Sequence, residues 1–460
     1  MAKAIDRGLE NREIVLGILT EVLDKGNFVH LVLNQALSKY QYLEKPDRAF
    51  ITRVTEGTLE YLLQIDFIIN SYSKTKTEKM KPLIRILRMS VYQLLYMDRV
   101  PDSAVCNEAV KLAVHHHFQG LKGFVNGVLR TIARNKEELD LKEPYLRYSL
   151  PQWMYSMWEK DWGKESAEKI AASFLKERPV WVRCNLNLAS KEEILAALKK
   201  QQVSAEQVEG FDSMLALSEY DHMESLDAFQ KGWIQVQDIS SALVGELAAP
   251  EKGSYIIDVC AAPGGKSLHL ADKMEGTGCV EARDLTYQKV ALIEENASRM
   301  GALNIKAVQW DATEFDPESE NKADLVIADL PCSGLGIIGR KPDIKYHTTK
   351  ENLRELSKLQ KEILSVVWKY VKPGGRLIYS TCTVNKEENA ENARWITENL
   401  PFKPEDLTEA FSSKGERYAC LKENMYPGAD LKNGQIQILA GIHPFEDFDG
   451  FFISVFKREA

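Results

Sequence analysis

Two cysteines stand directly after short apolar runs in the C-terminal half of the chain. Cys332 lies in the segment DLPCSG at 329–334, and Cys382 lies in STCT at 380–383. A lone cysteine at such a place is more often a small packing residue, but two at adjacent strand ends indicate thiolate chemistry. Asp329 would add a carboxyl group to the same pocket. The pattern therefore predicts a nucleophilic thiol with an acidic neighbour.

A loop of small residues, CAAPGGKS at 260–267, follows another apolar run. Its last three letters imitate a phosphate-binding P-loop, but that motif requires glycine where this chain has Cys260. The loop also lacks the GxGxxG pattern of dinucleotide-binding folds. What remains is a turn whose backbone can approach a ligand closely, so a nucleoside triphosphatase is disfavoured.

Acidic residues end the next two apolar runs. Asp284 follows Asp258 at about the interval where α/β nucleoside-binding folds place an acid that accepts from ribose hydroxyls, and Asp311 comes after the third run. A single aspartate after a strand is more often a helix cap. Two of them beside a glycine-rich turn favour an adenosine-containing cofactor that is bound without a phosphate-binding loop.

The elements that must position these residues alternate between strand and helix from about residue 235 onward. Apolar runs alternate with helical stretches such as 287–300 and 350–371, which is typical of a doubly wound, mostly parallel sheet. Ligands bind beyond the carboxyl ends of such strands. The apolar runs are 255–259, 279–282, 307–310, 325–328 and 376–379.

The first 140 or so residues have apolar residues at helical spacing throughout, which predicts an all-α bundle over 1–142. Three consecutive histidines, His115 to His117, suggest a metal site, but neighbouring residues of a helix point about 100° apart, so we expect no metal. The clearest helical segments are 13–24, 50–70, 83–97 and 103–116.

A small α+β module is predicted over 150–232, and an α/β domain over 233–460. The module begins with an aromatic-rich helix and continues with an alternating, strand-like run at 180–185. We expect the aromatic residues to be core rather than platforms for stacking bases. They are Trp153, Tyr155, Trp158 and Trp162.

Composition indicates a globular protein: 44% of the 460 residues are hydrophobic and 27% are charged. No apolar stretch approaches the roughly 18 residues needed to cross a bilayer, and charges interrupt the first 20 residues where a secretory signal would be apolar. We therefore expect a cytoplasmic protein. The seven cysteines include no close pair, so we expect free thiols rather than disulfides or a zinc site.

The net charge of -8 argues against a nucleic-acid partner, but the charge is unevenly distributed. Residues 1–150 contain 22 Lys and Arg against 18 Asp and Glu, so this part is positive. A basic cluster could form one face there, or be an ordinary solvated surface. Its members are Lys74, Lys76, Lys79, Lys81, Arg85 and Arg88.

Taken together, these motifs resemble the RNA 5-methylcytosine methyltransferases of the Nol1/Nop2/Sun group, which use S-adenosylmethionine. The resemblance rests on DVCAAPGGKS at 258–267, DLPCSG and STCT, and it is supported by three further segments. Near the N-terminus, CNEAV at 106–110 and FVNGVLR at 124–130 resemble the NusB-type RNA-binding domain. The supporting segments are QDISS at 237–241, RKPDIKY at 340–346 and DGFF at 449–452.

The resemblance implies a Rossmann-like class I methyltransferase domain that modifies carbon 5 of a cytosine in 16S ribosomal RNA. Cys382 would add to carbon 6, which makes carbon 5 enamine-like and able to accept a methyl group. Cys332 would assist release of the methylated base, and Asp329 would contact the cytosine edge and the cofactor. A base then removes the carbon 5 proton. The target must leave its stack, so a single-stranded or loop context is favoured.

For S-adenosylmethionine, the resemblance places a loop around the methionine portion, Asp284 at the ribose and Asp311 near the adenine, with Asp329 also in contact. Two departures stand out: Leu330 replaces the family's usual alanine and would add bulk near the pocket, and Arg283 leaves Glu281 as the alternative ribose ligand. The loop residues are Cys260, Ala261, Ala262, Pro263, Gly264, Gly265 and Lys266.

Other functions remain open. The same chemistry could act on transfer RNA or 23S ribosomal RNA, and the preference for 16S rests on analogy with NusB-type domains. A non-catalytic RNA-binding or antitermination factor is a second class, which the two cysteines argue against. A cysteine hydrolase is a distant third, because nothing ties a histidine to Cys382. A monomer is the expected state.

Overall fold

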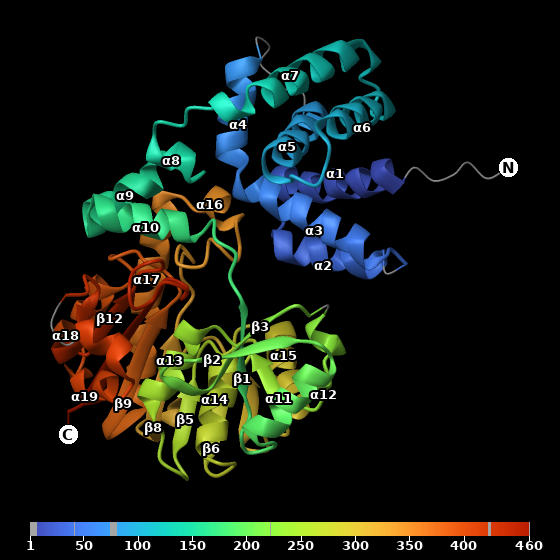
Figure 1. Cartoon of the computed structure of the whole chain (residues 1–460). Helices are drawn as coiled ribbons and strands as arrows, with labels where there is room; N and C mark the ends of the chain where they lie inside the picture. Colours follow the sequence, from blue (N-terminus) through green and yellow to red (C-terminus); the bar gives the residue numbers. More distant parts are fainter. Residues whose placement is uncertain (1–6, 41, 74–80, 221, 422–424, 460) are drawn as a thin grey trace. The chain divides into compact units, whose positions relative to one another are not determined.

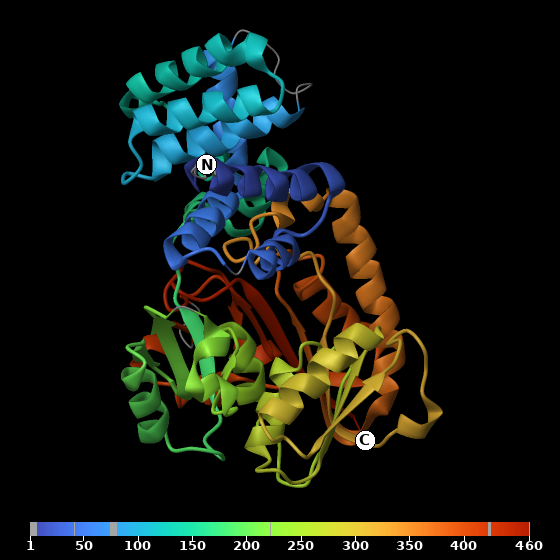
Figure 2. The same ribbon diagram turned by 90° about the vertical axis from the view of Figure 1, so that its right-hand side faces the viewer.

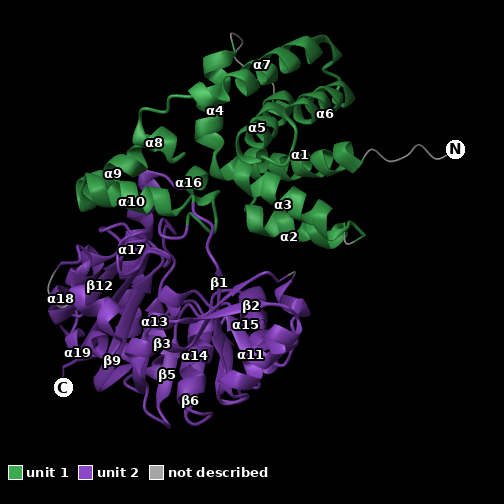
Figure 3. Cartoon of the chain, in the orientation of Figure 1, with its two compact units in different colours: residues 1–175, 338–347 green, residues 176–337, 348–460 purple. Residues whose placement is uncertain are grey.

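The computed structural model describes residues 7–40, 42–73, 81–220, 222–421 and 425–459. The chain divides into two compact units, of which unit 1 comprises Met1–Leu175 and Ile338–His347 and unit 2 the remainder (Figure 3). Unit 1 thus contains a short segment that comes from the middle of the second half of the sequence. Within the described residues, no helix is long and apolar enough to span a membrane.

Seven helices of unit 1 contribute buried residues to one hydrophobic core. Figures 1 and 2 show these helices from two sides. α5 lies at the centre of this core, with most of its residues buried. A close approach of α3 to α5 depends on Gly57, where an added Cβ would lie 2.0 Å from the Tyr92 ring. The helices are α1 (Arg7–Lys25), α2 (Val29–Lys39), α3 (Lys45–Glu60), α4 (Leu62–Tyr72), α5 (Lys81–Tyr96), α6 (Asp102–His115) and α7 (Lys122–Arg134).

The predicted single helix at 50–70 is wrong, because the chain forms two helices that break at Tyr61. Side chains distant in sequence take up the backbone groups that the break releases. Ser149 Oγ accepts from the amides of Leu63 and Gln64, at 3.2 and 3.4 Å. Lys345 Nζ donates to the carbonyl of Glu60 at 2.5 Å. Buried backbone groups must be paired, so these long-range contacts allow the break.

Two arginines of the possible basic face are paired with aspartates, one of them buried and the other half-buried. Arg85 is 2% exposed and forms an ion pair with Asp24. Arg88 makes two hydrogen bonds of 2.7 Å with Asp66. Lys74, Lys76 and Lys79 lie outside the described residues, so only Lys81 remains as an exposed member.

Further helices of unit 1 follow the bundle. Trp158 of α9 is fully buried, with its ring centroid 5.7 Å from that of Phe174, so it is a core residue. Three other short helices complete the unit, one of them from the inserted segment. These elements are α8 (Pro144–Arg147), α9 (Gln152–Trp162), α10 (Lys164–Ser173) and α16 (Ile344–His347).

Unit 2 begins with a four-stranded antiparallel sheet in the order β2-β3-β1-β4. Helix α11 begins with a capping box at Ser190 and packs Ile194 and Leu198 into the small core of this sheet. The bounds are β1 (Val180–Cys184), α11 (Lys191–Lys200), β2 (Ser204–Val208), β3 (Phe211–Ser218), α12 (Asp227–Gln230) and β4 (Ile234–Val236).

The second sheet of unit 2 has nine strands in the order β11-β12-β13-β9-β8-β5-β6-β7, with β10 beside β13. Neighbours from β9 to β7 run parallel, while the strands on the other side of β9 are antiparallel, so the sheet is mixed. The strands are β5 (Tyr255–Asp258), β6 (Cys279–Asp284), β7 (Ile305–Gln309), β8 (Ala323–Asp329), β9 (Val371–Thr381), β10 (Phe402–Pro404), β11 (Ala429–Asp430), β12 (Gln435–Ile438) and β13 (Phe451–Arg458).

Helices connect the parallel strands, which confirms the predicted α/β architecture (Figure 1). The amphipathic α17 buries Leu353, Ile363 and Leu364, and it ends at Val367, earlier than the sequence periodicity indicates. Because β5, β6, β8 and β9 are parallel, their carboxyl ends meet at one edge. The helices are α13 (Ile239–Ala248), α14 (Gly265–Lys273), α15 (Tyr287–Arg299), α17 (Lys350–Val367), α18 (Ala390–Asn399) and α19 (Thr408–Ser412).

Candidate active site

The small-residue loop lies between β5 and α14, at the carboxyl edge of the sheet. Gly264 adopts a φ of 101°, which favours glycine, and its amide donates to the carbonyl of Ala261 at 2.7 Å. Asp258, the last residue of β5, accepts a hydrogen bond from Ser267 Oγ at 2.7 Å. Burial raises the pKa of Asp258 to about 7, although Ser267 and Lys266 oppose the shift. The loop is thus fixed at both ends.

Asp284 is the acid that faces this loop. Its Oδ2 accepts from the amide of Ala262 at 3.0 Å, and its Oδ1 accepts from the amide of Leu285 at 2.8 Å. Lys289 Nζ lies 3.0 Å from the same Oδ1. The carboxylate therefore sits beside the loop, where the sequence predicts it.

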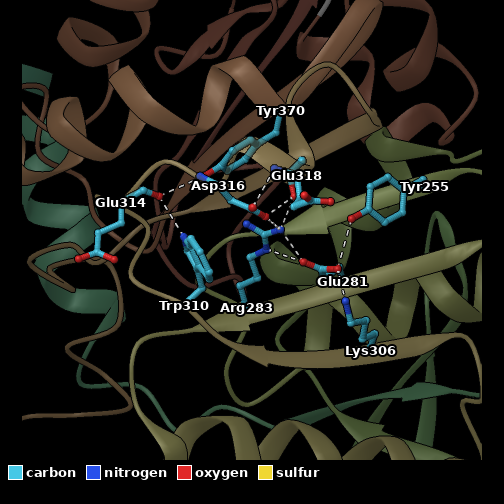
Figure 4. Close-up of polar contacts among 10 residues, drawn as sticks. Tyr255, Glu281, Arg283, Lys306, Trp310, Glu314, Asp316, Glu318 and Tyr370 are labelled. Carbon is cyan, nitrogen blue, oxygen red and sulfur yellow. Dashed lines mark hydrogen bonds and ion pairs between the residues drawn. The ribbon is translucent and has the colours of Figure 1, made fainter.

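Glu281, the alternative ribose ligand, points elsewhere. Successive side chains of a strand alternate between faces, so Glu281 shares a face with Arg283 and not with Asp284. Its carboxylate binds Arg283 Nε at 2.7 Å and Lys306 Nζ at 2.9 Å (Figure 4). Both carboxylate oxygens of Glu281 are occupied on that face, so the structure favours Asp284 over Glu281 as the candidate ribose ligand.

Arg283 is the centre of a buried polar cluster that the sequence did not reveal (Figure 4). Its Nη2 donates to Asp316 at 2.8 Å and to Ser319 at 2.5 Å. The guanidinium carbon lies 5.2 Å from the centroid of the Tyr370 ring and 5.5 Å from that of Trp310. This cluster holds the segment after β7, which contains Asp311, against β6.

Asp311 lies at the start of that segment and is half-buried. Its Oδ1 accepts from Thr313 Oγ1 at 2.7 Å and from the Thr313 amide at 2.9 Å. These hydrogen bonds, the side-chain one first, lower the pKa of Asp311. The aspartate therefore caps its own turn and stays anionic.

Lys266 pairs with Asp329 across the carboxyl edge. The Lys266 Nζ lies 2.7 Å from Asp329 Oδ2, while Ser380 Oγ donates to Asp329 Oδ1 at 2.7 Å. Burial lowers the pKa of Lys266, but the charge and hydrogen bond of Asp329 outweigh that effect, so the net shift is upward. The sequence predicts Lys266 in the cofactor loop and gives no sign that it holds the Asp329 carboxylate in place.

The two cysteines meet at the ends of neighbouring parallel strands. Asp329 of β8 is in register with Ser380 of β9, so the loops after these residues bring the Sγ atoms of Cys332 and Cys382 to 3.2 Å. The hydrogen bond with Cys382 raises the pKa of Cys332, and burial adds to this shift. Cys332 is thus held as a thiol next to a second sulfur, which matches the predicted convergence of the two loops.

Leu330 does not add bulk to the pocket, contrary to the expectation from sequence. Its side chain is 3% exposed and belongs to the hydrophobic core with Val259 and Ile363. Leu330 packs in the core that residues of α17 share with the sheet. At this position the chain therefore differs from the family pattern by a side chain that packs in the core.

Polar residues from the segment after Cys382 form the buried support of the site. Asn389 accepts from Thr381 Oγ1 at 2.5 Å and donates to the carbonyl of Thr383 at 3.0 Å. Glu388 accepts from the amide of Ser333 at 2.9 Å. In the sequence, the only signal was a polar run, NKEEN at 385–389, which also suits an exposed loop.

Two of the three consecutive histidines do converge, although neighbours on a helix were expected to diverge. His116 Nε2 lies 2.8 Å and His115 Nδ1 3.4 Å from the carboxylate of Glu13. His116 is the C-cap of α6, with φ -89° and ψ 26°, so it departs from helical geometry. The possible ligand atoms of Glu13, His115 and His116 lie within 4.8 Å of one another, so this part of the sequence argument against a metal site is not supported by the structure.

The loop and its surroundings fit the expected cofactor, S-adenosylmethionine. A Cβ built on Gly265 would meet nothing within 4 Å, so open space faces the backbone there. Leu285, beside Asp284, is 55% exposed and offers an apolar surface at the same edge. The set of a small-residue turn, an acid and an exposed apolar side chain suits a nucleoside rather than a phosphate.

Comparisons with known proteins identify the family. Three family models match successive parts of the chain: the NusB family over 9–134, the RsmF/B-like ferredoxin-like domain over 150–223 and the 16S rRNA methyltransferase RsmB/F over 246–457. A probable ribosomal RNA small subunit methyltransferase B of Bacillus subtilis is 34% identical, covering 97% of this chain and 98% of that protein. The chain belongs to the RsmB family of 16S rRNA methyltransferases.

Other relatives agree with this assignment. Ribosomal RNA small subunit methyltransferase B of Cronobacter sakazakii is 32% identical, over 89% of this chain and 95% of that protein. The crystal structure of PH0851 is 25% identical and covers 99% of this chain and 100% of its own, with a TM-score of 0.79. NSun6 from Pyrococcus horikoshii, solved with SFG, is 21% identical over 67% of this chain and 98% of its own, with a TM-score of 0.57, and shares the fold.

Membership of this family confirms the expected fold class: a helical NusB domain, a small ferredoxin-like domain and a C-terminal methyltransferase domain. It also confirms the expected methyltransferase family and its cofactor, S-adenosylmethionine.

Proposed function

We propose that this protein methylates carbon 5 of a cytosine in 16S ribosomal RNA through a covalent adduct between Cys382 and carbon 6. The observation that carries the proposal is the 3.2 Å approach of Cys332 and Cys382 at adjacent strand ends, beside an Asp329 carboxylate that Lys266 and Ser380 hold in place. The names of the relatives and of the family model support 16S as the RNA.

The chemistry follows from what the side chains can do. The sulfur of Cys382 bonds to carbon 6 of the ring, which makes carbon 5 nucleophilic. S-adenosylmethionine supplies an electrophilic methyl group when bound. A base then takes the proton from carbon 5, the C5–H electron pair forms the C5=C6 double bond, and the C6–S pair returns to Cys382. Asp329 holds the cytosine edge, and Cys332 assists the departure of Cys382.

For the cofactor, we propose that the loop from Cys260 to Lys266 surrounds the methionine portion, that Asp284 accepts from the ribose and that Asp311 lies near the adenine. The contacts of Asp284 with the loop support its role, because one acid then orders both the loop and the ligand. Asp311 is anionic and half-buried, so one face stays accessible. We expect a monomer, since one chain carries both cysteines.

The RNA contact is assigned to the helical part of unit 1, within residues 1–142. α7 exposes Lys122, Arg130 and Arg134, and the last two, four residues apart, are neighbours on one face of the helix. Phosphate binding needs such clustered positive charge. A deletion of the helical part would also remove the partners of the segment Ile338–His347, which belongs to the same unit, so substitutions on α7 are the cleaner test.

Transfer of a labelled methyl group to unmethylated 16S RNA tests the proposal, with 23S and transfer RNA alongside. We expect label on cytosine carbon 5 of 16S RNA, abolished by Cys382→Ala and unchanged by Cys279→Ala, a matched cysteine at the other end of a sheet strand. Cys332→Ala should leave protein covalently attached to RNA. Label on another RNA alone would overturn the target, and activity that survives Cys382→Ala would overturn the mechanism.

A non-catalytic RNA-binding factor predicts a different outcome in the same assay. Such a protein would bind RNA through α7 and transfer no label, and Cys382→Ala would change nothing. The Lys266–Asp329 ion pair and the two converging thiols argue against it, because RNA binding alone does not require these groups to be held together at the carboxyl edge.

A further inference from the structure

One buried carboxylate joins the two cysteine-bearing loops. Glu388 accepts four hydrogen bonds, all from neutral donors: two from Ser333, one from Gln360 and one from Asn385. The Ser333 amide lies 2.9 Å from Oε2 and the Ser333 hydroxyl 2.5 Å from Oε1. Since Ser333 directly follows Cys332, the carboxylate binds the chain at the residue next to the thiol.

The same carboxylate also binds the segment that follows Cys382. Asn385 Nδ2 donates to Glu388 Oε1 at 3.0 Å. Thr383, the residue after Cys382, has its Oγ1 2.8 Å from the Ser333 hydroxyl that Glu388 holds. Gln360 of α17 bridges Glu388 Oε2 and the carbonyl of Pro331, at 3.1 and 2.8 Å. Glu388 therefore connects the Cys332 loop to the Cys382 loop.

Other residues hold the Cys382 loop independently of Glu388. Asn389 binds Thr381 and the Thr383 carbonyl, and Gln437 Nε2 donates to the same carbonyl at 3.0 Å. These contacts do not reach the Cys332 loop. The support of the site is thus unequal: the contacts of Asn389 and Gln437 lie on the Cys382 side, whereas those of Glu388 include the Cys332 loop as well.

We propose that Glu388 is a positioning residue for the release step, holding the Cys332 thiol against the sulfur of Cys382 so that the adduct resolves after methylation. This inference rests on the proposed function. During release the C5–H electron pair forms C5=C6, a base takes the proton, and the C6–S pair returns to Cys382. The Cys332 S–H donates a hydrogen bond to the departing thiolate across the 3.2 Å contact.

Electrostatics reinforce this division of roles. The hydrogen bond with Cys382 and burial raise the pKa of Cys332, and the negative charge of Glu388 adds to the shift. Cys332 therefore keeps its proton, which suits a hydrogen-bond donor and prevents it from competing as the nucleophile. A carboxylate at 388 serves this end, whereas an amide of the same shape would keep the packing and lose the charge.

Glu388→Gln tests the inference because it keeps the shape and replaces one acceptor oxygen with a donor. The experiment uses the full chain, S-adenosylmethionine and 16S RNA, and quantifies protein that stays attached to RNA on a denaturing gel. We expect the attached fraction to rise severalfold and turnover to fall about tenfold, because a misplacement of one ångström in a reacting group can cost about a hundredfold. The rate of the first methyl transfer should change far less.

Epistasis separates a role through Cys332 from general damage. In a Cys332→Ala background, Glu388→Gln should add nothing to the attached fraction, because the group that it positions is gone. Asn389→Ser is the matched control in the same loop, and it should slow adduct formation instead of release. If Glu388→Gln lowers first-turnover methylation and the attached fraction together, or acts equally in both backgrounds, the inference is overturned.

Two further measurements distinguish a loss of positioning from a failure to fold. S-adenosylmethionine binding and the thermal unfolding midpoint report whether Glu388→Gln folds. If it does not, Ser333→Ala removes one of the four hydrogen bonds from the other end and should raise the attached fraction by a smaller factor; no rise would refute the role. The single variants Cys332→Ala and Cys382→Ala test the proposed function itself, so its failure would show in them and not only at Glu388.

Discussion

Lys345 offers a quantitative test of how the inserted segment is held in unit 1. Burial lowers the pKa of this lysine to about 7, and the opposing charge of Glu60 does not restore it. Its ammonium donates to the carbonyls of Glu60 at 2.5 Å and of Ser149 at 2.7 Å. The perturbation is Lys345→Met, which keeps the apolar stem and removes the titrating group.

Two effects of this substitution oppose each other near pH 7.5. The variant escapes the cost of deprotonating a lysine whose unfolded pKa is about 10.4, which is about 4 kcal/mol at 1.36 kcal/mol per pKa unit. It also leaves two buried carbonyls without a donor, at about 1–3 kcal/mol each. These nearly cancel, so the absolute stability near neutrality is a poor measure.

The pH dependence is the decisive quantity. The folded pKa is depressed, so the unfolded chain binds more protons between pH 7 and 10, and the stability of the native protein must rise with pH in that window. From pH 7.5 to 9.5 the gain is about 2.5 kcal/mol, or about 5–10 °C in unfolding midpoint. The Lys345→Met variant should lack this gain.

Differential scanning calorimetry of both proteins from pH 7.5 to 9.5 measures the difference in midpoint. Lys142→Met is the matched control in the same unit, because the side chain of Lys142 is 80% exposed. We expect the midpoint of the native protein to rise relative to Lys345→Met and to stay parallel to Lys142→Met. Parallel curves for all three proteins would refute the assignment of Lys345 as a buried group with a depressed pKa.

Three further predictions concern packing, the cofactor loop and the Arg283 cluster. Gly57→Ala should destabilise unit 1 by about 1–3 kcal/mol or more and lower its unfolding midpoint, because its Cβ would meet the Tyr92 ring; Gly17→Ala, which meets nothing within 4 Å, should instead stabilise slightly, and equal effects would contradict the packing argument. The pKa of Asp258 is raised in the folded protein, so the stability of the native protein should fall by up to about 3 kcal/mol as the pH rises from 5 to 8. Asp258→Asn should lack this fall, and a variant with the same pH profile as the native protein would contradict the prediction. Arg283→Met should weaken binding of S-adenosylmethionine, measured by calorimetry, because Asp316 loses its ion pair with Arg283 and the segment that contains Asp311 is held less firmly against β6. Lys306→Met removes only an exposed partner of Glu281 and should have a smaller effect.

Much of the candidate site at the carboxyl edge of the sheet could be predicted from sequence, because the residues that follow a strand are set by the local sequence. Cys332, Cys382, Asp329 and Asp284 each follow an apolar run, and parallel strands bring such positions to one edge. The helical bundle was equally accessible, since apolar periodicity reports a buried face. These positions share one property: their placement depends on the element they end, and not on a partner elsewhere.

Features that depend on partners could not be inferred from the sequence. The break at Tyr61 occurs because Ser149 and Lys345, far along the chain, satisfy the groups it frees. Arg85 looks like a surface cation until Asp24 is seen beside it. Pairing energies of this kind arise from contacts between elements, and periodicity carries no information about them.

The order of strands and helices, which is legible in the sequence, specifies the chemical groups that reach the carboxyl edge, because it sets the residues that come after each strand. Three other features are established only by the folded chain: Lys266 holds Asp329, Asp284 rather than Glu281 faces the loop, and Glu388 joins the two cysteine loops. Each of these depends on distances of about 3 Å between separate segments, at which a hydrogen bond or an ion pair forms or fails to form.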